Sequence, residues 1–266
     1  MDRFSDRGSI PLASTNFFKT LCINRSVLSI LKENFMKITI IHGQSHKGST
    51  YHIARMLAEK VGGEITEFFL PRDFSENCLG CTSCFMKGEE NCPHYEKLLP
   101  ISKAMSEADL LIFASPVYVY HATGAMKSFL DHYGYMWMVH RPRREMFAKQ
   151  AVCISTAAGG GTKSTNKDMS DSLFFWGVPK IYNIGVNVQA TDWKSVSEKI
   201  KKSTEHKTDA IAKKIKSRNG KITPGIKTGA FFFMMSLLQK NGWNEADKNY
   251  WHEMGWTDGN KPWKKN

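Results

Sequence analysis

Long apolar runs are missing from this sequence of 266 residues. A membrane-spanning helix needs about 20 consecutive apolar residues, and the best candidate, GAFFFMMSLL at 229–238, has about half that length. Short apolar stretches near the N-terminus are interrupted by Asn24, Arg25, Lys32 and Glu33, which is unlike a secretory signal peptide. We therefore expect a cytoplasmic protein with no membrane span, whose thiols are free or bind metal rather than forming structural disulfides.

Motifs for hydrolytic chemistry are also missing. The sequence contains neither the H-E-x-x-H pattern of zinc proteases nor the G-x-S-x-G turn of α/β-hydrolases. It has no Walker A sequence and no G-x-G-x-x-G fingerprint. Of the scattered histidines, His121 and His132 are expected to be structural or rim residues. No side chain is therefore assigned as a catalytic acid, base or nucleophile.

Negative charge is scarce, with 25 Asp and Glu against 37 Lys and Arg. Residues 194–227 hold 11 basic and three acidic residues, which is +8 of the net charge of +12. We expect one long helix here, with an apolar stripe and lysines facing water; the stripe is formed by Val196, Ile200, Ile211 and Ile215. A solvated helix face explains the charge, and no nucleic-acid-binding motif accompanies it. No nucleic-acid partner is predicted.

Strands and helices alternate through the middle of the chain. Apolar, β-branched runs predict strands at 37–43, 64–70, 109–116, 150–156 and 181–188. Amphipathic segments between these strands predict helices, among them 96–107, 123–137 and 163–175. This alternation predicts an α/β fold, a flavodoxin-like doubly wound five-stranded parallel sheet with helices on both faces.

The alternating pattern occupies only part of the chain. Residues 1–35 show weak periodicity. We expect either that Met36 is the functional start or that residues 1–35 form a disordered or loosely attached N-terminal extension. Residues 36–222 form the predicted flavodoxin-like domain. Residues 223–266 are apolar and rich in tryptophan, and we expect a C-terminal extension that docks on its own domain or on a partner.

The first candidate binding segment is GQSHKGST, residues 43–50, between a predicted strand and a predicted helix. Backbone N–H groups at such a turn, with the hydroxyls of Ser45, Ser49 and Thr50, form a suitable cradle for a phosphate group. Gly43 and Gly48 permit the tight turn and the close approach of the anion. A plain turn that caps the helix is the alternative.

Two further segments follow other strands of the predicted sheet. SPVYVYHATGAMKSFLDH, residues 115–132, places Pro116, Val117 and Tyr118 directly after the third strand. STAAGGGTKST, residues 155–165, follows the fourth strand, and its glycines allow the backbone to lie flat against a planar ligand. All three segments fall at the carboxyl ends of strands, where a doubly wound sheet binds its ligand.

The first two segments resemble the paired motifs of flavodoxin-like NAD(P)H-dependent FMN reductases, a Ser-rich phosphate loop and an SPxY…G…K…LD segment. The cysteine-containing loop between them is similar to that of the iron–sulfur flavoproteins in the same superfamily. The resemblance covers about residues 36–190. One departure is His46-Lys47, where many members have Pro-Arg, so that Lys47 is left to supply the counter-charge of the phosphate.

This resemblance implies FMN as the cofactor and NAD(P)H as the co-substrate. It implies that Ser45, Ser49 and Thr50 bind the FMN phosphate, with Lys47 and Gly48 in the same loop. The residues implied to line the flavin ring and ribityl chain are Pro116, Val117, Tyr118, Thr156 and Gly159. The flavin then supplies the reactivity while the protein orients it.

Four of the six cysteines occur in CLGCTSCFMKGEENC, with C-x2-C-x2-C-x7-C spacing; they are Cys78, Cys81, Cys84 and Cys92. Zinc normally takes two separated pairs of ligands, and disulfides are disfavoured in the cytoplasm. A [4Fe–4S] cluster suits the compact spacing better. A thiol-rich loop without metal remains the fourth interpretation.

Two functions remain open. The first is an FMN-dependent NAD(P)H oxidoreductase that transfers hydride from a nicotinamide to bound FMN and then to a small acceptor such as a flavin or a quinone. The second is an iron–sulfur flavoprotein that carries electrons between redox protein partners. A homodimer is expected in either case, because a flavin at a sheet edge often needs a neighbouring subunit to cover it.

Overall fold

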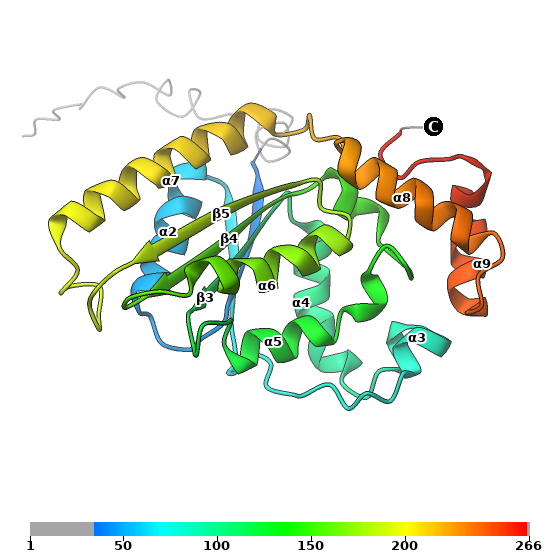
Figure 1. Cartoon of the computed structure of the whole chain (residues 1–266), viewed down its shortest axis with the longest axis horizontal. Helices are drawn as coiled ribbons and strands as arrows, with labels where there is room; N and C mark the ends of the chain where they lie inside the picture. Colours follow the sequence, from blue (N-terminus) through cyan, green and yellow to red (C-terminus); the bar gives the residue numbers. More distant parts are fainter. Residues whose placement is uncertain (1–34, 265–266) are drawn as a thin grey trace, which may run out of the picture. The chain divides into compact units, whose positions relative to one another are not determined.

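The computed structural model describes residues 35–264 (Figure 1). The expectation of an N-terminal extension falls on residues 1–35, which lie outside the described residues except for Phe35. Residues 36–266 cluster as one compact unit by their contacts. None of the helices in residues 35–264 combines the length and the apolarity needed to cross a membrane.

The sheet has five parallel strands in the order β2-β1-β3-β4-β5. The strands are β1 (Lys37–His42), β2 (Glu64–Phe69), β3 (Leu110–Pro116), β4 (Gln150–Ala157) and β5 (Lys180–Asn187). Each predicted strand is present, with ends that differ by at most one residue. This order is that of flavodoxin-like folds, and it reverses between β1 and β3. The predicted fold class is confirmed.

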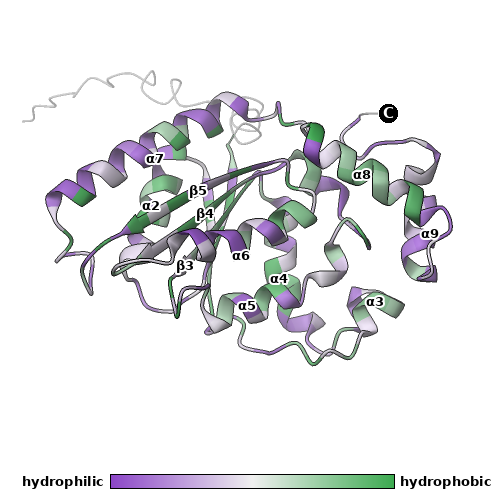
Figure 2. Cartoon of the chain, in the orientation of Figure 1, coloured by the Kyte–Doolittle hydropathy of each residue, from purple (hydrophilic) through white to green (hydrophobic). Residues whose placement is uncertain are grey.

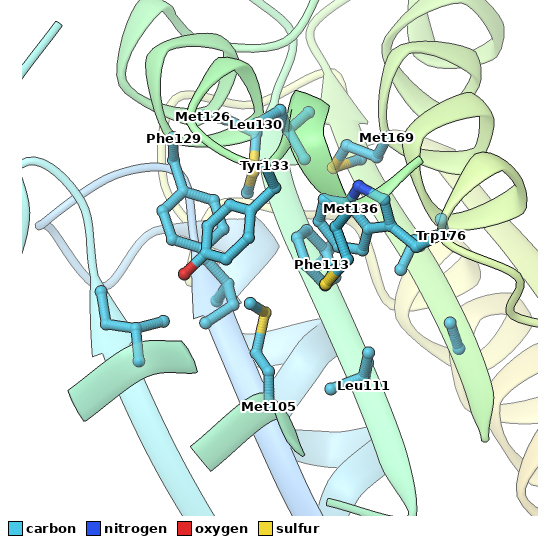
Figure 3. Close-up of a cluster of buried hydrophobic side chains, with 14 of the residues drawn as sticks. Met105, Leu111, Phe113, Met126, Phe129, Leu130, Tyr133, Met136, Met169 and Trp176 are labelled. Atoms are coloured by element: carbon cyan, nitrogen blue, oxygen red, sulfur yellow. The ribbon is translucent and has the colours of Figure 1, made fainter. Parts of the chain in front are cut away.

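Helices cover both faces of the sheet (Figure 1). On one face, α2 (Ser49–Val61) and α7 (Glu198–Arg218) pack together, burying side chains such as Ile53, Leu57 and Ile215. On the other face lie α4 (Tyr95–Glu107), α5 (Gly124–Asp131) and α6 (Thr162–Phe175). Figure 3 shows the core under this second layer, where Phe129, Tyr133 and Trp176 pack around Phe113 of β3.

The lysine-rich segment differs from its prediction. Helix α7 ends at Arg218, and α8 (Ile226–Gln239) begins only after seven residues that include Gly220 with φ of +68° and Pro224. The single helix expected over 194–227 is therefore wrong, because glycine and proline interrupt it. Figure 2 shows α7 as largely hydrophilic on its outer surface. The helix expected over 123–137 also ends early, at Asp131, and a 3-10 turn (Gly134–Met136) follows.

The C-terminal segment packs against its own domain. Helices α8 and α9 (Glu245–Glu253) form a separate core with residues that lead into β4; its buried members are Met138, Phe147, Phe232, Met235, Trp251 and Trp256. Short elements complete the chain: α3 (Ser83–Lys87), η1 (Glu89–Asn91), η3 (Arg144–Ala148) and η4 (Trp256–Asp258). Helix α9 contacts α3, so the last helix of the chain reaches the cysteine-containing segment.

Candidate functional site

A cleft of about 270 Å³ lies where the loops after β1, β3 and β4 meet. Its lining comes from four segments, which are residues 42–51, 114–118, 156–158 and 188–191. Parallel strands all present their carboxyl ends at the same edge of the sheet, and the order of these strands reverses beside β1. The cleft therefore lies at the position where a doubly wound fold binds its ligand.

The N-terminus of α2 opens into this cleft. Ser49 and Thr50 begin the helix, line the cleft and are otherwise buried. The first N–H groups of a helix have no partner within the helix, and the N-cap residue Gly48 has no side chain to satisfy them. No acidic residue occupies the first turn. The helix dipole and the open N–H groups together make this end of the cleft suited to an anion.

Thr50 also connects the two sides of the cleft. Its hydroxyl oxygen lies 2.5 Å from the hydroxyl oxygen of Thr156 at the end of β4, and both residues are buried. The donor of the pair keeps both of its lone pairs, and the acceptor keeps one lone pair and its O–H, so the pair can accept or donate a hydrogen bond toward the cleft. Two threonines 106 residues apart in sequence are thus placed together by the adjacent strand ends.

The loop after β1 is held by Thr123, the N-cap residue of α5. The Thr123 hydroxyl donates a hydrogen bond to the Gly43 carbonyl at 2.6 Å and accepts one from the Met126 N–H at 3.2 Å. A side chain at position 43 would lie 2.9 Å from that hydroxyl oxygen, so only glycine fits. The sequence signal for Thr123 was an N-cap threonine before an apolar helix, which sequence reasoning did not connect to the cleft.

The rim of the cleft is a strained turn. Val119 and Tyr120 adopt φ values of +48° and +66°, a backbone region that non-glycine residues rarely occupy. The Gln44 side-chain amide donates a 2.7 Å hydrogen bond to the Tyr118 hydroxyl. Tyr118, Val119 and Tyr120 are 46%, 93% and 69% exposed. Backbone strain of this kind is maintained where a site requires it, and here it presents apolar side chains beside the cleft.

The glycine-containing loop after β4, residues 158–161, packs against this rim. Gly161 has φ of +93°, and a Cβ atom there would lie only 2.7 Å from Cγ1 of Val117. The Ser164 hydroxyl donates a hydrogen bond to the Tyr120 carbonyl. Glycine at position 161 therefore serves close packing of the two loops, and the loops position Val117 in the wall of the cleft.

His42 is a cleft residue that sequence reasoning missed. It is the last residue of β1, is 3% exposed, and its Nε2 atom lies 2.8 Å from a carboxylate oxygen of Glu67. Its ring stacks on Phe69 with centroids 4.4 Å apart. Burial lowers the pKa of His42, against the opposing effects of the hydrogen bond and charge of Glu67. A polar residue closing an apolar strand was the available signal.

Seven of the ten predicted cofactor-binding residues line the cleft, namely Gly48, Ser49, Thr50, Pro116, Val117, Tyr118 and Thr156. The other three are placed differently. The Ser45 hydroxyl donates to the Leu70 carbonyl at 3.2 Å, and the Lys47 ammonium lies 5.1 Å from the centre of the Tyr51 ring. Gly159 is exposed, and a Cβ atom at that residue would meet no other atom within 4 Å.

The four clustered cysteines lie outside the lining of the cleft. Cys78 and Cys81 are exposed, whereas Cys84 and Cys92 are half-buried. Burial, followed by the charges of Cys92, Cys78 and Cys81, raises the pKa of Cys84 to about 11. Hydrogen bonds from Ser83 lower the pKa of Cys81.

The helix that carries Cys84 is held by residues from distant parts of the chain. Arg141 donates hydrogen bonds to the carbonyls of Cys84 and Phe85, and its guanidinium pairs with Asp247 of α9. The Asn244 amide donates to the Phe85 carbonyl at 3.0 Å. Arg141 and Asp247 are both buried. Figure 1 shows α3 beside α9, well separated from the N-terminus of α2.

Known proteins resemble this chain in both sequence and fold. A family model described as NADPH-dependent FMN reductase matches residues 36–192. An iron–sulfur flavoprotein from Archaeoglobus fulgidus is 32% identical over 135 residues, covering 49% of this chain and 57% of that protein. Another, from Methanocaldococcus jannaschii, is 31% identical over 139 residues, covering 49% and 67%. The match thus spans little more than half of the first of these relatives.

Solved structures show the same fold at low identity. A flavone reductase has a TM-score of 0.50 and 20% identity, with 70% of this chain and 64% of that chain covered. An NAD(P)H:quinone oxidoreductase from Methanothermobacter marburgensis has a TM-score of 0.52 and 14% identity, with 68% and 97% covered. These likenesses agree with the strand order and helix layers described above.

Proposed function

This chain belongs to the NADPH-dependent FMN reductase family, and on that basis we propose that it is an FMN-dependent NAD(P)H oxidoreductase acting on a small acceptor such as a flavin or a quinone. The observation that carries the proposal is the anion site in the cleft, where the uncapped N-terminus of α2 meets the buried hydroxyls of Thr50 and Thr156. A phosphate group fits this combination of donors.

The donor set suits FMN in both of its parts. Ser49, Thr50 and the first-turn N–H groups of α2 would hold the phosphate. Lys47 is exposed beside this loop and would add positive charge, while Ser45 would act by fixing the loop through Leu70. Pro116, Val117 and Tyr118 offer apolar surface to a flat ring, and Gly159 belongs to the neighbouring loop.

When bound, FMN would supply the hydride and electron transfer chemistry. The contribution of the protein is to bind and orient. Tyr118 is held by Gln44, and Val117 is held by the packing of Gly161 against it. His42 closes the floor of the cleft in a neutral state, because burial lowers its pKa. No proton transfer by a side chain is required by this arrangement.

A second subunit would complete the site in this proposal. Tyr118, Val119 and Tyr120 present apolar surface at the cleft rim, and such surface marks contacts with other molecules. We propose a homodimer that covers this rim, and the check is the molar mass in solution with and without Val119→Lys. The five cysteines among residues 35–264 are free, which suits a reducing compartment such as the cytoplasm.

The decisive test of the flavin site introduces negative charge without harming the helix. Ser49→Asp places a carboxylate at the first turn of α2, where it interacts favourably with the helix dipole but repels a phosphate. We expect FMN affinity to fall by about 100-fold or more, equal to about 2.7 kcal/mol, and the melting temperature of the same variant separates loss of affinity from loss of fold. NADPH oxidation should fall in parallel.

The matched control is Ser197→Asp, at the N-cap of α7, where aspartate is an equally good cap and which does not line the cleft. This variant should bind FMN as the original chain does. Unchanged FMN affinity in Ser49→Asp, measured by quenching of flavin fluorescence, would place the phosphate elsewhere. Absence of FMN binding by the original chain would refute the oxidoreductase proposal.

A specific observation favours a second candidate, an iron–sulfur flavoprotein that passes electrons between redox proteins. The curated relatives carry that name, and four cysteines of this chain fall within the 15 residues from Cys78 to Cys92. A [4Fe–4S] cluster held by Cys78, Cys81, Cys84 and Cys92 is consistent with their spacing. The cluster would be positioned by α3, which Arg141 and Asn244 hold.

Purification without oxygen, followed by iron and sulfide analysis, separates the two candidates. A yellow, iron-free protein that oxidises NADPH supports the reductase. A brown protein with about four iron atoms per chain and poor NADPH turnover supports the electron carrier. In the second case Cys81→Ser should lose the cluster while FMN binding is retained, because none of the four cysteines lines the cleft.

A further inference from the structure

Cys92, His94 and His132 bring one sulfur and two ring nitrogens together. One potential ligand atom from each of them lies within 4.8 Å of the others, in the single such group found among residues 35–264. None of the three lines the cleft. Cys92 and His94 are half-buried and His132 is 3% exposed.

Two helix ends create this arrangement. Cys92 closes the turn η1, and two residues later His94 is the N-cap residue of α4. His132 is the C-cap residue of α5, 38 residues from His94. The backbone N–H of Tyr95 bonds to the Cys92 carbonyl at 2.9 Å, which fixes the turn between the first two side chains. Each of the three residues therefore stands at the end of a helix or 3-10 turn, where the backbone is fixed by hydrogen bonds.

The nitrogen geometry is close to that of a metal site. Nδ1 of His94 and Nε2 of His132 lie 2.9 Å apart. Two nitrogens on one tetrahedral ion, each bonded at about 2.0–2.1 Å, are separated by about 3.3 Å. A small rotation of either ring therefore opens enough room for an ion to replace the proton between the two nitrogens.

The outer nitrogens of both rings face the kind of group that orients metal-binding histidines, within hydrogen-bond distance for His132 and beyond it for His94. Nδ1 of His132 donates to the Ser128 carbonyl at 2.8 Å, which leaves the Nε2 lone pair directed at His94. The other nitrogen of His94, Nε2, lies 4.0 Å from a carboxylate oxygen of Glu76. Such carbonyl and carboxylate partners set the tautomer and the orientation of ligating histidines.

We propose that Cys92, His94 and His132 bind one divalent ion of the zinc class. A thiolate and two imidazoles select borderline-soft ions over Mg²⁺ or Ca²⁺, which prefer oxygen ligands. Three protein ligands leave a fourth position for water. This metal site is separate from the proposed flavin site. It excludes an iron–sulfur cluster that uses Cys92, because Cys92 cannot bind both.

The ion would join the cysteine-containing segment to helix α5, which also supports the cleft. It would connect the cysteine-containing turn at Cys92 to the C-terminal end of α5. The other end of α5 begins after Thr123, whose hydroxyl holds the Gly43 loop of the cleft. An ion at His132 would therefore restrict the motion of a helix that also supports the cleft.

The test uses Co²⁺ and Zn²⁺ with the full reduced chain, freed of iron by chelation. Co²⁺ should bind one per chain, with the intense visible bands of a tetrahedral ion and a thiolate charge-transfer band, and Zn²⁺ should displace it. Cys92→Ser and His94→Gln should each weaken binding by more than about 100-fold, since loss of even an outer partner costs about 10–100-fold. Zn²⁺ should raise the melting temperature of the original chain, and His94→Gln should abolish that rise.

Cys81→Ser is the matched control, because Cys81 lies in the same loop but outside the group of three. It should bind Co²⁺ unchanged, although it would lose an iron–sulfur cluster. Equal loss in Cys81→Ser and Cys92→Ser, a spectrum without thiolate, or unchanged affinity in His94→Gln would each overturn the proposal. FMN binding is measured on the same samples, so failure of the flavin site is distinguished from failure of the metal site.

Discussion

The cleft at the carboxyl ends of β1, β3 and β4 and the segment around α3 and His94 are positioned by different kinds of contact. In the cleft, backbone does most of the positioning: strand ends, the first turn of α2 and glycines at places where a side chain would collide. Around α3, side chains do most of the positioning. The side chains are those of Arg141, Asp247, Asn244 and the hydrogen-bonded pair His94 and His132. The first site should therefore tolerate most single side-chain changes, and the second should not.

The largest effect is expected for Asp247→Ala, which would destabilise the region around α3 and leave the cleft intact. Arg141 would remain buried without its partner, at a cost of about 3–5 kcal/mol in the free energy of unfolding. Urea unfolding measures this loss, and proteolysis near α3 should increase. As a control, Asp131→Asn removes an exposed pair with Lys127 and should cost less than about 0.5 kcal/mol. Similar losses in both variants would contradict the difference drawn between the regions.

Gly161→Ala should damage the cleft through the backbone. The φ of +93° and the 2.7 Å approach to Val117 make a side chain strained at this position, at a cost of about 1–3 kcal/mol. We expect FMN affinity to fall about tenfold, because Val117 would leave its place in the wall. Gly159→Ala meets no atom within 4 Å and should leave FMN affinity unchanged. If the two variants bind FMN equally well, the glycine loop does not shape the cleft.

The pH dependence of stability should report on His42. Burial lowers its pKa in the folded chain, whereas the unfolded chain titrates near the ordinary value of about 6.5. The unfolded state then binds the proton more readily, so the free energy of unfolding falls as pH drops below about 6.5, by up to about 1.4 kcal/mol per pH unit, until the folded-state pKa is passed. In His42→Gln this part of the slope should be missing from urea unfolding curves at about pH 5–7. An identical slope would exclude His42 as the cause.

The smallest effect is expected for Thr50→Val. This change removes the hydrogen bond between the Thr50 and Thr156 hydroxyls from a cleft that is positioned mainly by backbone. FMN affinity should weaken by about 0.5–1.5 kcal/mol, or about three- to tenfold. Thr39→Val removes a buried hydroxyl that donates to the Ala104 carbonyl, outside the cleft, and should lower stability without changing FMN affinity. A loss above about 100-fold in Thr50→Val would mean that side chains dominate this site too.

The contrast also explains what the sequence could predict. Continuous apolar runs mark buried strands, so all five strands were placed within one residue, and the loops after β1, β3 and β4 followed from the fold. Gly48 and Thr50 were predicted for the cleft because their positions relative to a strand end can be read from local sequence, whereas Thr156 was implied by the family resemblance. The boundary of α7 could have been read from Gly220 and Pro224.

The remaining features depend on pairings between distant residues, which local patterns do not encode. His42 was missed because its partner Glu67 lies on the adjacent strand. The sequence predicts only a structural or rim role for His132, because its pairing with His94 depends on the packing of α4 beside α5. Arg141 and Asp247 are 106 residues apart. Such contacts become visible only when the helices are placed in space.

The ion pair between Arg141 and Asp247 also has a consequence for the order in which parts of the chain fold during translation. Every residue lining the cleft lies between 42 and 191, so the cleft can close while the ribosome is still translating the remainder. The Phe85 carbonyl gains its second donor only when Asn244 has emerged, and Arg141, which donates to the Cys84 and Phe85 carbonyls, gains its carboxylate partner only with Asp247. Domains generally fold from the N-terminus during translation. Helix α3 therefore gains its last contacts from residues that follow every cleft residue in the chain.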